Sequence, residues 1–211
     1  TAPQGQQMVV TLPDGSEVEL NGGSTLRYER SFGDVRGLRL RGEAFFDVAT
    51  DERPFLVRTF NAEVRALGTA FNVRARPNAP STWTQVTLVE GTVEVQTQSE
   101  GATAVRMQAG ETRRVQGETA RLTAPLDVSV EEATAWRRGD LIAKDRPLGE
   151  LIPEVEYRFV IELTVRPPSL RQKRISVALR DPKTAESVVR DLALVLGLEY
   201  RETANGFTLH E

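Results

Sequence analysis

The 211-residue sequence contains no cysteine and only one histidine, His210, next to its C-terminal residue. Without thiols there can be no disulfide, no thiolate catalysis and no zinc–thiolate site. One imidazole cannot build a multi-histidine metal centre, and a Ser-His-Asp triad would have to use His210. The sequence also lacks an apolar run as long as the roughly 20 residues of a membrane-spanning helix. Its first four residues have neither the basic start nor the apolar core of a signal peptide, so we expect a cytosolic protein or a soluble piece of a longer one.

The sequence also lacks an excess of either charge. Its 27 Lys and Arg residues stand against 30 Asp and Glu residues, which gives a net charge of -3. No general attraction to nucleic acid or to anionic lipid follows from this balance. The content of hydrophobic residues (39%) and charged residues (27%) is that of a folded globular protein, and the length favours two small domains over one large domain.

The first part of the chain, from Met8 to about Val130, reads as short strands separated by turns. In VVTLPDGSEVELN the segment Pro13-Asp14-Gly15 supplies a turn, and apolar residues alternate with glutamates after it, as in a half-buried hairpin. The same alternation recurs at intervals of roughly 8 to 12 residues, which predicts an antiparallel sandwich, barrel or rolled sheet. The alternating residues are Leu38 and Leu40; Ala44, Phe46 and Val48; Phe55, Val57 and Thr59; Val64 and Ala66; Phe71 and Val73; Val86 and Leu88; Val93 and Val95.

The pattern changes after Ala124-Pro125. A short helical connector is predicted at residues 131–136, and Pro147 begins a helix with an apolar stripe at Leu148, Leu151, Ile152 and Val155. Strands are predicted at 159–163 and 175–179. A second helix has Asp181 as its N-cap and ends at Gly197, and a closing hairpin turns at Asn205-Gly206. We therefore predict a β domain at 1–130, a connector at 131–146 and a small α+β domain of order α-β-β-α-β-β at 147–211.

Few residues carry an evident chemistry. There is no phosphate-binding loop, no dinucleotide-binding glycine pattern and no metal-ligand spacing, so we expect neither a cofactor nor a metal ion. The acidic pairs Asp51-Glu52 and Glu43 with Asp47 could serve a glycosidase on a β scaffold. A turn at the first pair and a solvated strand face at the second are the simpler interpretations.

A basic cluster consists of Arg166, Arg171, Lys173 and Arg174. It could dock an acidic partner, or it could protect a strand edge from aggregation, and the sequence favours neither.

The stretch LGTAFNV, residues 67–73, places a Gly-Thr pair within a strand-like run. A glycine there marks a β-bulge or the close approach of another backbone. The hydroxyl of Thr69 could also attack the carbonyl of Gly68, and hydrolysis of the resulting ester would cut the chain. From the residues alone, a bulge with a surface threonine is the simpler interpretation.

Taken together, these segments resemble the FecR family of transmembrane anti-sigma regulators. The resemblance covers most of residues 8–151 in the family's order and spacing. The segments are LPDGSEVELNGGSTLRY (12–28), LRGEAFFDVATDERPFLV (40–57), VRALGTAFNV (64–73), VTLVEGTVEV (86–95), MQAGE (107–111) and AWRRGDLIAKDRPLGEL (135–151). Residues 147–210 resemble the STN module, which occurs in secretins, TonB-dependent receptors and these regulators. The matching segments are PLGELIPEV, ISVAL, KTAESVVRDLALVLGLEY and NGFTL.

The resemblance implies a periplasmic, soluble part of a single-pass inner-membrane protein, with the cytoplasmic anti-sigma segment and the membrane helix lying outside this sequence. It implies contact with the N-terminal signalling domain of a TonB-dependent receptor, followed by proteolysis by site proteases and release of the sigma factor, often for iron uptake. Some members break at the Gly-Thr pair, which would make Thr69 the nucleophile and Gly68 the acyl donor. The chain would then perform at most one self-cleavage and no turnover chemistry.

The receptor contact has one candidate site in this sequence. A receptor segment could add a strand beside Ile175, Val177 and Leu179, next to Arg171, Lys173 and Arg174. An envelope polysaccharide-binding or assembly module that reuses an STN domain is the alternative function, and a glycosidase using Glu43 or Asp51 is a third.

Overall fold

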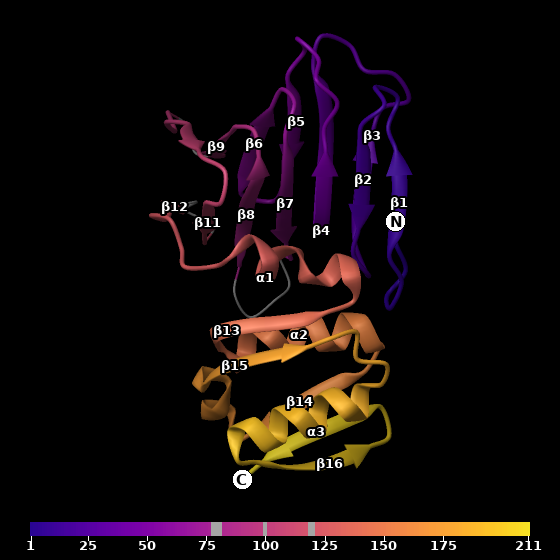
Figure 1. Ribbon diagram of the computed structural model, residues 1–211, viewed down its shortest axis with the longest axis vertical. Coiled ribbons are helices and arrows are strands. Elements are labelled where there is room, and N and C mark those ends of the chain that lie inside the picture. The colour runs from indigo at the N-terminus through magenta and orange to yellow at the C-terminus, as the bar shows by residue number, and fades with distance from the viewer. Residues whose placement is uncertain (77–81, 99–100, 118–120) are drawn as a thin grey trace. The chain divides into compact units, whose positions relative to one another are not determined.

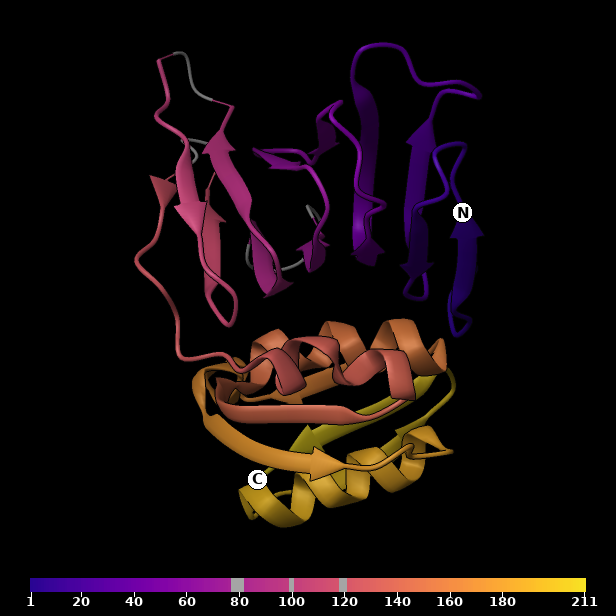
Figure 2. The same cartoon turned by 45° about the horizontal axis from the view of Figure 1, so that its top comes forward.

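The chain folds into two units, residues Thr1–Thr134 and Ala135–Glu211, in a computed structural model that describes residues 1–76, 82–98, 101–117 and 121–211 (Figure 1). The first unit is almost entirely β, and the second combines helices with small sheets (Figure 2). This confirms the predicted fold class, a rolled or sandwich-like β region followed by a small α+β region.

The strands of the first unit form one continuous hydrogen-bonded network. Its order is β10-β9-β6-β5-β4-β7-β8-β11-β12, with β2 and β3 also pairing with β4 and with β1 pairing with β2. The strands are Met8–Thr11 (β1), Glu17–Leu20 (β2), Thr25–Tyr28 (β3), Arg36–Asp47 (β4), Phe55–Arg58 (β5), Ala62–Ala66 (β6), Ala70–Ala75 (β7), Trp83–Glu90 (β8), Val93–Thr97 (β9), Val105–Met107 (β10), Thr112–Gln116 (β11) and Arg121–Leu122 (β12).

The long strand β4 connects the two halves of this network. Its first half pairs with β3 and, in parallel, with β5, whereas its second half pairs with β2 and β7. Gly42 lies between the two halves with φ +112°, and a Cβ there would lie 2.4 Å from the Ser24 hydroxyl oxygen. The Ser24 hydroxyl in turn accepts a hydrogen bond from the amide of Glu43. Glycine is therefore needed where the strand passes from one half of the network to the other.

The core of the first unit consists of the alternating residues that the sequence predicted. Phe46 is fully buried, stacks on Phe71 with ring centroids 5.1 Å apart and meets Phe55 edge-on at 6.0 Å. Burial of one such ring contributes roughly 1.5–3 kcal/mol to stability. The same core includes Leu38 and Leu40 of the first half of β4 and Val93 and Val95 of β9, which confirms the period-two reading of these strands.

The second unit contains two small sheets and two main helices. One sheet pairs β13 with β15, and the other has the order β14-β17-β16, with β14 and β17 parallel. The elements are Ala135–Arg138 (η1), Leu141–Pro147 (β13), Leu148–Phe159 (α2), Glu162–Arg166 (β14), Pro168–Gln172 (η2), Arg174–Leu179 (β15), Ala185–Leu196 (α3), Glu199–Thr203 (β16) and Gly206–His210 (β17).

Both helices contact strands of both sheets, α2 through β13 and β14 and α3 through β15, β16 and β17. The second unit therefore has two small sheets, and each helix contacts strands of both. The predicted order α-β-β-α-β-β is correct for α2 to β17. The predicted apolar stripe of α2 is fully or almost fully buried, including Leu148 and Val155, and it packs in one core with Leu192 of α3.

The segment predicted as a connector, 131–146, holds three elements. The helix Val130–Thr134 (α1) and η1 account for its predicted helical part, but residues from Leu141 onward belong to β13. The sequence did not indicate β13 because its alternation is interrupted: the pairing with β15 shifts between Ala143 and Arg146, and Asp145 has φ +48°.

Three predicted local features of the second unit were wrong in detail. The strand predicted at 159–163 is β14 at Glu162–Arg166, because α2 extends to Phe159 and Val160 is its C-cap. The N-cap of α3 is Thr184, whose hydroxyl accepts a hydrogen bond from the Ser187 amide, whereas Asp181 lies outside the helix with φ +40°. The closing hairpin has Thr203 opposite Gly206, so its turn residues are 204 and 205. Gly206 is needed for packing, since a Cβ there would lie 2.1 Å from the backbone oxygen of Glu162.

Candidate functional site

The Gly68-Thr69 pair lies in the bend between β6 and β7, directly before β7 begins. The carbonyl of Leu67 accepts a hydrogen bond from the amide of Asp51, and the carbonyl of Thr69 accepts one from the amide of Val48. The carbonyls on both sides of Gly68 are therefore tied to the segment that follows β4. This holds the peptide bond between Gly68 and Thr69 in a fixed frame.

Glycine at position 68 is required by close packing. A Cβ there would lie 2.6 Å from the Thr50 hydroxyl oxygen and 3.1 Å from its Cα. Gly68 does not have a left-handed φ, so packing and not backbone dihedral strain selects the glycine. A Cβ on Gly91 would likewise lie 2.9 Å from the Gly68 carbonyl oxygen. The close backbone approach predicted from the sequence is confirmed at this position.

The predicted bulge is also present, but not at the Gly-Thr pair itself. The pairing of β7 with β8 shifts between Ala70 and Phe71, one residue beyond the pair. The prediction of a surface threonine was wrong, since Thr69 is only 5% exposed and its hydroxyl donates a 3.1 Å hydrogen bond to the Thr92 carbonyl. The hydroxyl is buried because the turn after β8 packs against it.

A fully buried arginine holds this region together. The Arg36 guanidinium donates hydrogen bonds to the carbonyls of Ala49, Arg53 and Leu67 at 2.8, 3.0 and 3.1 Å. It also forms a 2.8 Å ion pair with Asp14, and the two side chains are 0% and 1% exposed. One cation therefore links the β1–β2 turn, the segment before β5 and the residue preceding Gly68. The sequence alone did not indicate this role.

The carboxylate partner of Arg36 is itself well satisfied. Asp14 accepts hydrogen bonds from the amide and the hydroxyl of Ser16 as well as from Arg36. Burial on its own raises the pKa of Asp14, but these hydrogen bonds and the nearby guanidinium charge outweigh burial and hold the pKa below its ordinary value. Asp14 is therefore ionised at neutral pH and completes a buried ion pair.

The predicted partner-binding residues of the second unit divide into two groups. Ile175 is buried, and Val177 and Leu179 are partly buried against the core, so these three side chains contribute to the core of the unit. Lys173 donates to the Leu196 carbonyl at the end of α3, and Arg174 donates to Asp145.

The backbone of β15 pairs with β13 on one side. Among the described residues, no strand pairs with its other edge. Arg171 is half-buried, and its backbone lies so close to Gly149 that a Cβ on that glycine would be 3.2 Å from the Arg171 carbonyl oxygen. The structure therefore leaves a strand edge beside the predicted basic residues.

The predicted acidic pairs lie in different environments. Glu43 is 5% exposed and accepts hydrogen bonds from the side-chain amides of Asn21 and Asn72. The expected solvated face at Glu43 was therefore wrong, although Asp47 is exposed. Asp51 is held by an ion pair and hydrogen bonds from Arg53, which lower its pKa well below the ordinary range. Both carboxylates are engaged as hydrogen-bond acceptors within the fold.

The described residues hold neither a cluster of metal ligands nor a membrane-spanning helix. No group of three or more His, Asp or Glu side chains there is placed to hold a metal ion. None of the helices described there combines the length and the apolar character that crossing a bilayer requires.

Comparison with known proteins identifies the family. A model of the FecR protein family matches residues 1–94. Two crystal structures of a putative anti-sigma factor from Parabacteroides distasonis ATCC 8503, at 2.50 and 1.65 Å resolution, are similar to this chain. Each is 30% identical, with a TM-score of 0.90 over 100% of this chain and 97% of the other. The chain belongs to the FecR family of anti-sigma regulators.

Membership of the FecR family gives this chain a regulatory role in sigma-factor signalling and confirms the resemblance to that family stated from its motifs. The structural similarity extends over both units, although the family model itself ends at residue 94. No curated protein matches the chain.

Proposed function

We propose that this FecR-family chain is the periplasmic part of a transmembrane anti-sigma regulator. In this proposal it receives a signal from a TonB-dependent outer-membrane receptor and controls an extracytoplasmic-function sigma factor through proteolysis. The observation that carries the proposal is the match to the putative anti-sigma factor, which includes both units at a TM-score of 0.90. The cytoplasmic segment that contacts the sigma factor and the membrane helix would lie upstream of Thr1.

The second unit is the proposed receptor-binding unit, and β15 is the proposed contact strand. Its edge away from β13 has no strand partner among the described residues, so its amides and carbonyls on that side are open to strand addition. Ser176 and Ala178 are exposed between the core-facing residues of β15, and Arg174 is exposed at its start. An added receptor strand would take its affinity from backbone hydrogen bonds and part of its specificity from these side chains.

The experiment uses the purified chain and the N-terminal signalling domains of the TonB-dependent receptors of the source bacterium, each produced separately. Binding is measured by calorimetry, and hydrogen exchange is followed for the binding pair. We expect one receptor domain to bind and to slow exchange at residues 174–179. Protection at another edge strand in place of β15, such as Glu199–Thr203 (β16), would reject β15 as the contact strand. The absence of binding by every receptor domain would reject the receptor coupling itself.

A charge-reversal series locates the basic contribution. Arg171→Glu is the most informative variant, because Lys173 and Arg174 already hold α3 and Asp145 in place. Arg190→Glu on the exposed face of α3 serves as the matched control. The proposal predicts weaker receptor binding in Arg171→Glu only, and equal binding in the two variants would remove the basic cluster from the contact.

We also propose that the chain cleaves itself once, between Gly68 and Thr69. The Thr69 hydroxyl oxygen attacks the carbonyl carbon of Gly68, its proton passes to the Thr69 amide nitrogen and the C–N bond breaks. The product is an ester between Gly68 and Thr69 with a free α-amine. Water then hydrolyses the ester, leaving a carboxyl group on Gly68 and restoring the Thr69 hydroxyl.

Three observations support this proposal. The Thr69 hydroxyl is buried and donates to the Thr92 carbonyl, which favours electron density on the attacking oxygen. The carbonyls of Leu67 and Thr69 are both fixed by hydrogen bonds, which reduces the entropy lost in reaching a reactive geometry. Arg36 adds a second hydrogen bond to the Leu67 carbonyl and so acts as a positioning residue.

The two fragments would remain associated after cleavage. Residues 1–68 contain β4 and β6, whereas residues after 68 contain β7 and β9. The β4–β7 and β6–β9 ladders cross the cut, and they are unaffected by the loss of one peptide bond. The cut would therefore be detected only under denaturing conditions.

Intact mass spectrometry of the denatured chain, fresh and after days at neutral pH, tests the cleavage. We expect fragments 1–68 and 69–211, which are lost in Thr69→Ala and retained in Thr69→Ser. Thr50→Ala is the control, because the Thr50 hydroxyl also lies beside Gly68. A single intact mass in the unmodified chain refutes self-cleavage, and cleavage that survives Thr69→Ala but not Thr50→Ala assigns the nucleophile to the other hydroxyl.

A further inference from the structure

Arginines from three neighbouring strands meet on the outer face of the first unit's sheet. In the β3–β4 pairing Arg27 lies opposite Arg39, and in the β4–β5 pairing Arg39 lies opposite Arg58. Arg41 of β4 lies opposite Thr25, two residues along the same face. All four arginines are exposed, while Leu38 and Leu40 between them point into the core. We call Arg27, Arg39, Arg41 and Arg58 the arginine face.

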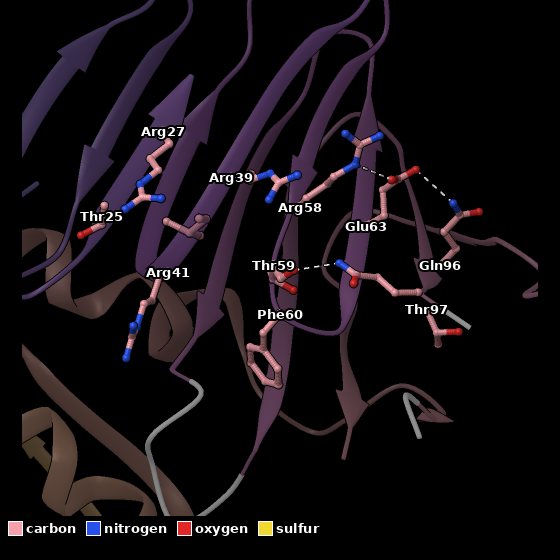
Figure 3. Close-up of a pocket in the computed structure, with 12 residues that line it drawn as sticks. Thr25, Arg27, Arg39, Arg41, Arg58, Thr59, Phe60, Glu63, Gln96 and Thr97 are labelled. Atoms are coloured by element: carbon pink, nitrogen blue, oxygen red, sulfur yellow. Dashed lines mark hydrogen bonds and ion pairs between the residues drawn. The ribbon is translucent and has the colours of Figure 1, made fainter. Parts of the chain in front are cut away.

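The arginine face lines a cavity of about 860 Å³ (Figure 3). Besides the arginines, its wall includes Thr25, Thr59, Phe60, Glu63 and Gln96. Phe60 is half-buried and supplies an aromatic surface, and the hydroxyl and amide groups supply neutral hydrogen bonds. Small-ligand pockets have volumes of roughly 300–1,000 Å³, and this cavity lies within that range. Its lining is mostly polar and charged, with Leu40 and Phe60 as the apolar side chains, which suits a charged ligand.

The positive charge of the arginine face is neutralised by a carboxylate only at the Arg58 end. Arg58 donates a 3.0 Å hydrogen bond to Glu63, whose second oxygen accepts from Gln96. In the described part of the chain, Arg27, Arg39 and Arg41 form no ion pair with a carboxylate. Like charges directly opposite each other on paired strands lower stability, so the fold itself gains nothing from this row. The chain as a whole has a net charge of -3, so the row is a local concentration of positive charge.

We propose that the arginine face binds a compact organic anion with two or more carboxylate or phosphate groups. Neighbouring strands lie about 4.8 Å apart, so adjacent guanidinium groups can each bind one acidic group of the same molecule. The planar guanidinium group binds both kinds of acid through paired hydrogen bonds. Phe60 provides the contact for the carbon skeleton.

The extent of the positive charge favours a compact ligand over a charged polymer. Along the register row Arg27, Arg39 and Arg58 are followed directly by Glu63. The positive stretch therefore spans two strand spacings, about 10 Å. The Glu63 carboxylate would repel a polyanion that continued across the sheet. This inference goes beyond the proposed receptor coupling and self-cleavage and depends on neither, since the cavity is lined by no residue of β15 and by neither Gly68 nor Thr69.

Calorimetric titration of the purified chain at 150 mM salt tests the proposal. The probes are tripolyphosphate and propane-1,2,3-tricarboxylate, with acetate as the monovalent comparison. We expect both multivalent probes to bind with a Kd below about 1 mM and acetate not to bind. Loss of one charged hydrogen-bond donor should weaken binding roughly tenfold in Arg27→Gln or Arg39→Gln. Arg30→Gln removes an exposed charge outside the cavity and should bind as the unmodified chain does.

Three outcomes would overturn the proposal. The first is that neither multivalent probe binds, and the second is that Arg39→Gln and Arg30→Gln bind the probes equally well. The third is that a polymer binds better than the compact probes. The last arm uses hexaglutamate and polygalacturonate: at least tenfold tighter binding of either, lost in Arg39→Gln, would assign the face to an acidic peptide or glycan. Thermal unfolding of each variant without ligand confirms that it remains folded.

Discussion

Replacing Arg36 by methionine should destabilise the first unit strongly. The change leaves Asp14 buried without its cation and leaves the carbonyls of Ala49, Arg53 and Leu67 without this donor. Removing one partner of a buried ion pair costs about 3–5 kcal/mol. A domain of this kind has a total stability of roughly 5–15 kcal/mol, so the loss is a large part of it. Urea unfolding followed by tryptophan fluorescence should show a correspondingly lower midpoint.

The effect should depend on pH, and the sign follows from the pKa of Asp14. In the unmodified chain this pKa is depressed below its ordinary value of 3.8, so the ion pair stabilises above that pH and its contribution falls as pH drops through the folded pKa. In Arg36→Met, burial without the cation should raise the pKa of Asp14. A carboxyl group whose pKa is raised by folding destabilises the folded state more and more as pH rises through that range, and costs little at low pH. The difference between the two proteins should therefore be smaller at pH 4 than at pH 7.

The matched control is Arg53→Met. Arg53 also pairs with an aspartate, Asp51, but the two side chains are 42% and 25% exposed, and an exposed pair contributes at most about 1 kcal/mol. The double variant Arg36→Met with Asp14→Asn should be more stable than Arg36→Met alone, because no unpaired charge remains buried. This reasoning would be refuted if Arg36→Met and Arg53→Met lowered the free energy of unfolding equally. It would also be refuted if the loss in Arg36→Met were the same at pH 4 and pH 7.

Three further predictions concern the second unit. Thr184→Ala removes the N-cap of α3 and should lower stability by about 1 kcal/mol in urea unfolding, and a larger loss in Asp181→Ala would contradict the assigned cap. Gly206→Ala places a Cβ 2.1 Å from the Glu162 backbone oxygen and should cost about 2–3 kcal/mol, with unchanged thermal unfolding as the contrary result. Val160→Gly relieves an exposed left-handed residue with φ +56° after α2 and should raise stability by about 0.5–1 kcal/mol, whereas a loss would show that the valine side chain is needed there.

Local periodicity predicted the strands of the first unit well because each strand has one buried face. In β4 the alternation placed Leu38 and Leu40 in the core, and the same parity places Arg36 inward and Arg39 outward. The residues that contact these side chains could not be predicted from periodicity. Asp14 is 22 residues from Arg36 in the sequence, and only the long-range pairing of the strands brings them together.

The same limit applies to the arginine face. The outward direction of Arg39 and Arg41 could be inferred from alternation with the leucines of β4. Their meeting with Arg27 and Arg58 depends on the registers of β3 and of the parallel strand β5. Register is set by the whole fold and by turn geometry, so a single sequence does not specify it.

In the second unit, helix periodicity was sufficient to predict α2 and α3, but it did not predict the residues at which they begin and end. Asp181 and Thr184 are both acceptable N-caps, and the choice depends on contacts outside the helix. The Asp181 carboxylate forms ion pairs with Lys183 and, at 3.6 Å, with Arg158. Its side chain is therefore engaged outside the helix and does not cap it. The alternation in β13 was obscured by the bulge at Lys144 and Asp145.

The most direct test of receptor-coupled sigma-factor control is RNA sequencing of the source bacterium with and without the gene for this chain. The account predicts that the transcripts of one TonB-dependent receptor and its neighbouring uptake genes cease to respond to the imported ligand in the deletion strain. The response should return when the full gene is restored. An unchanged ligand response of every receptor transcript in the deletion strain would contradict the account.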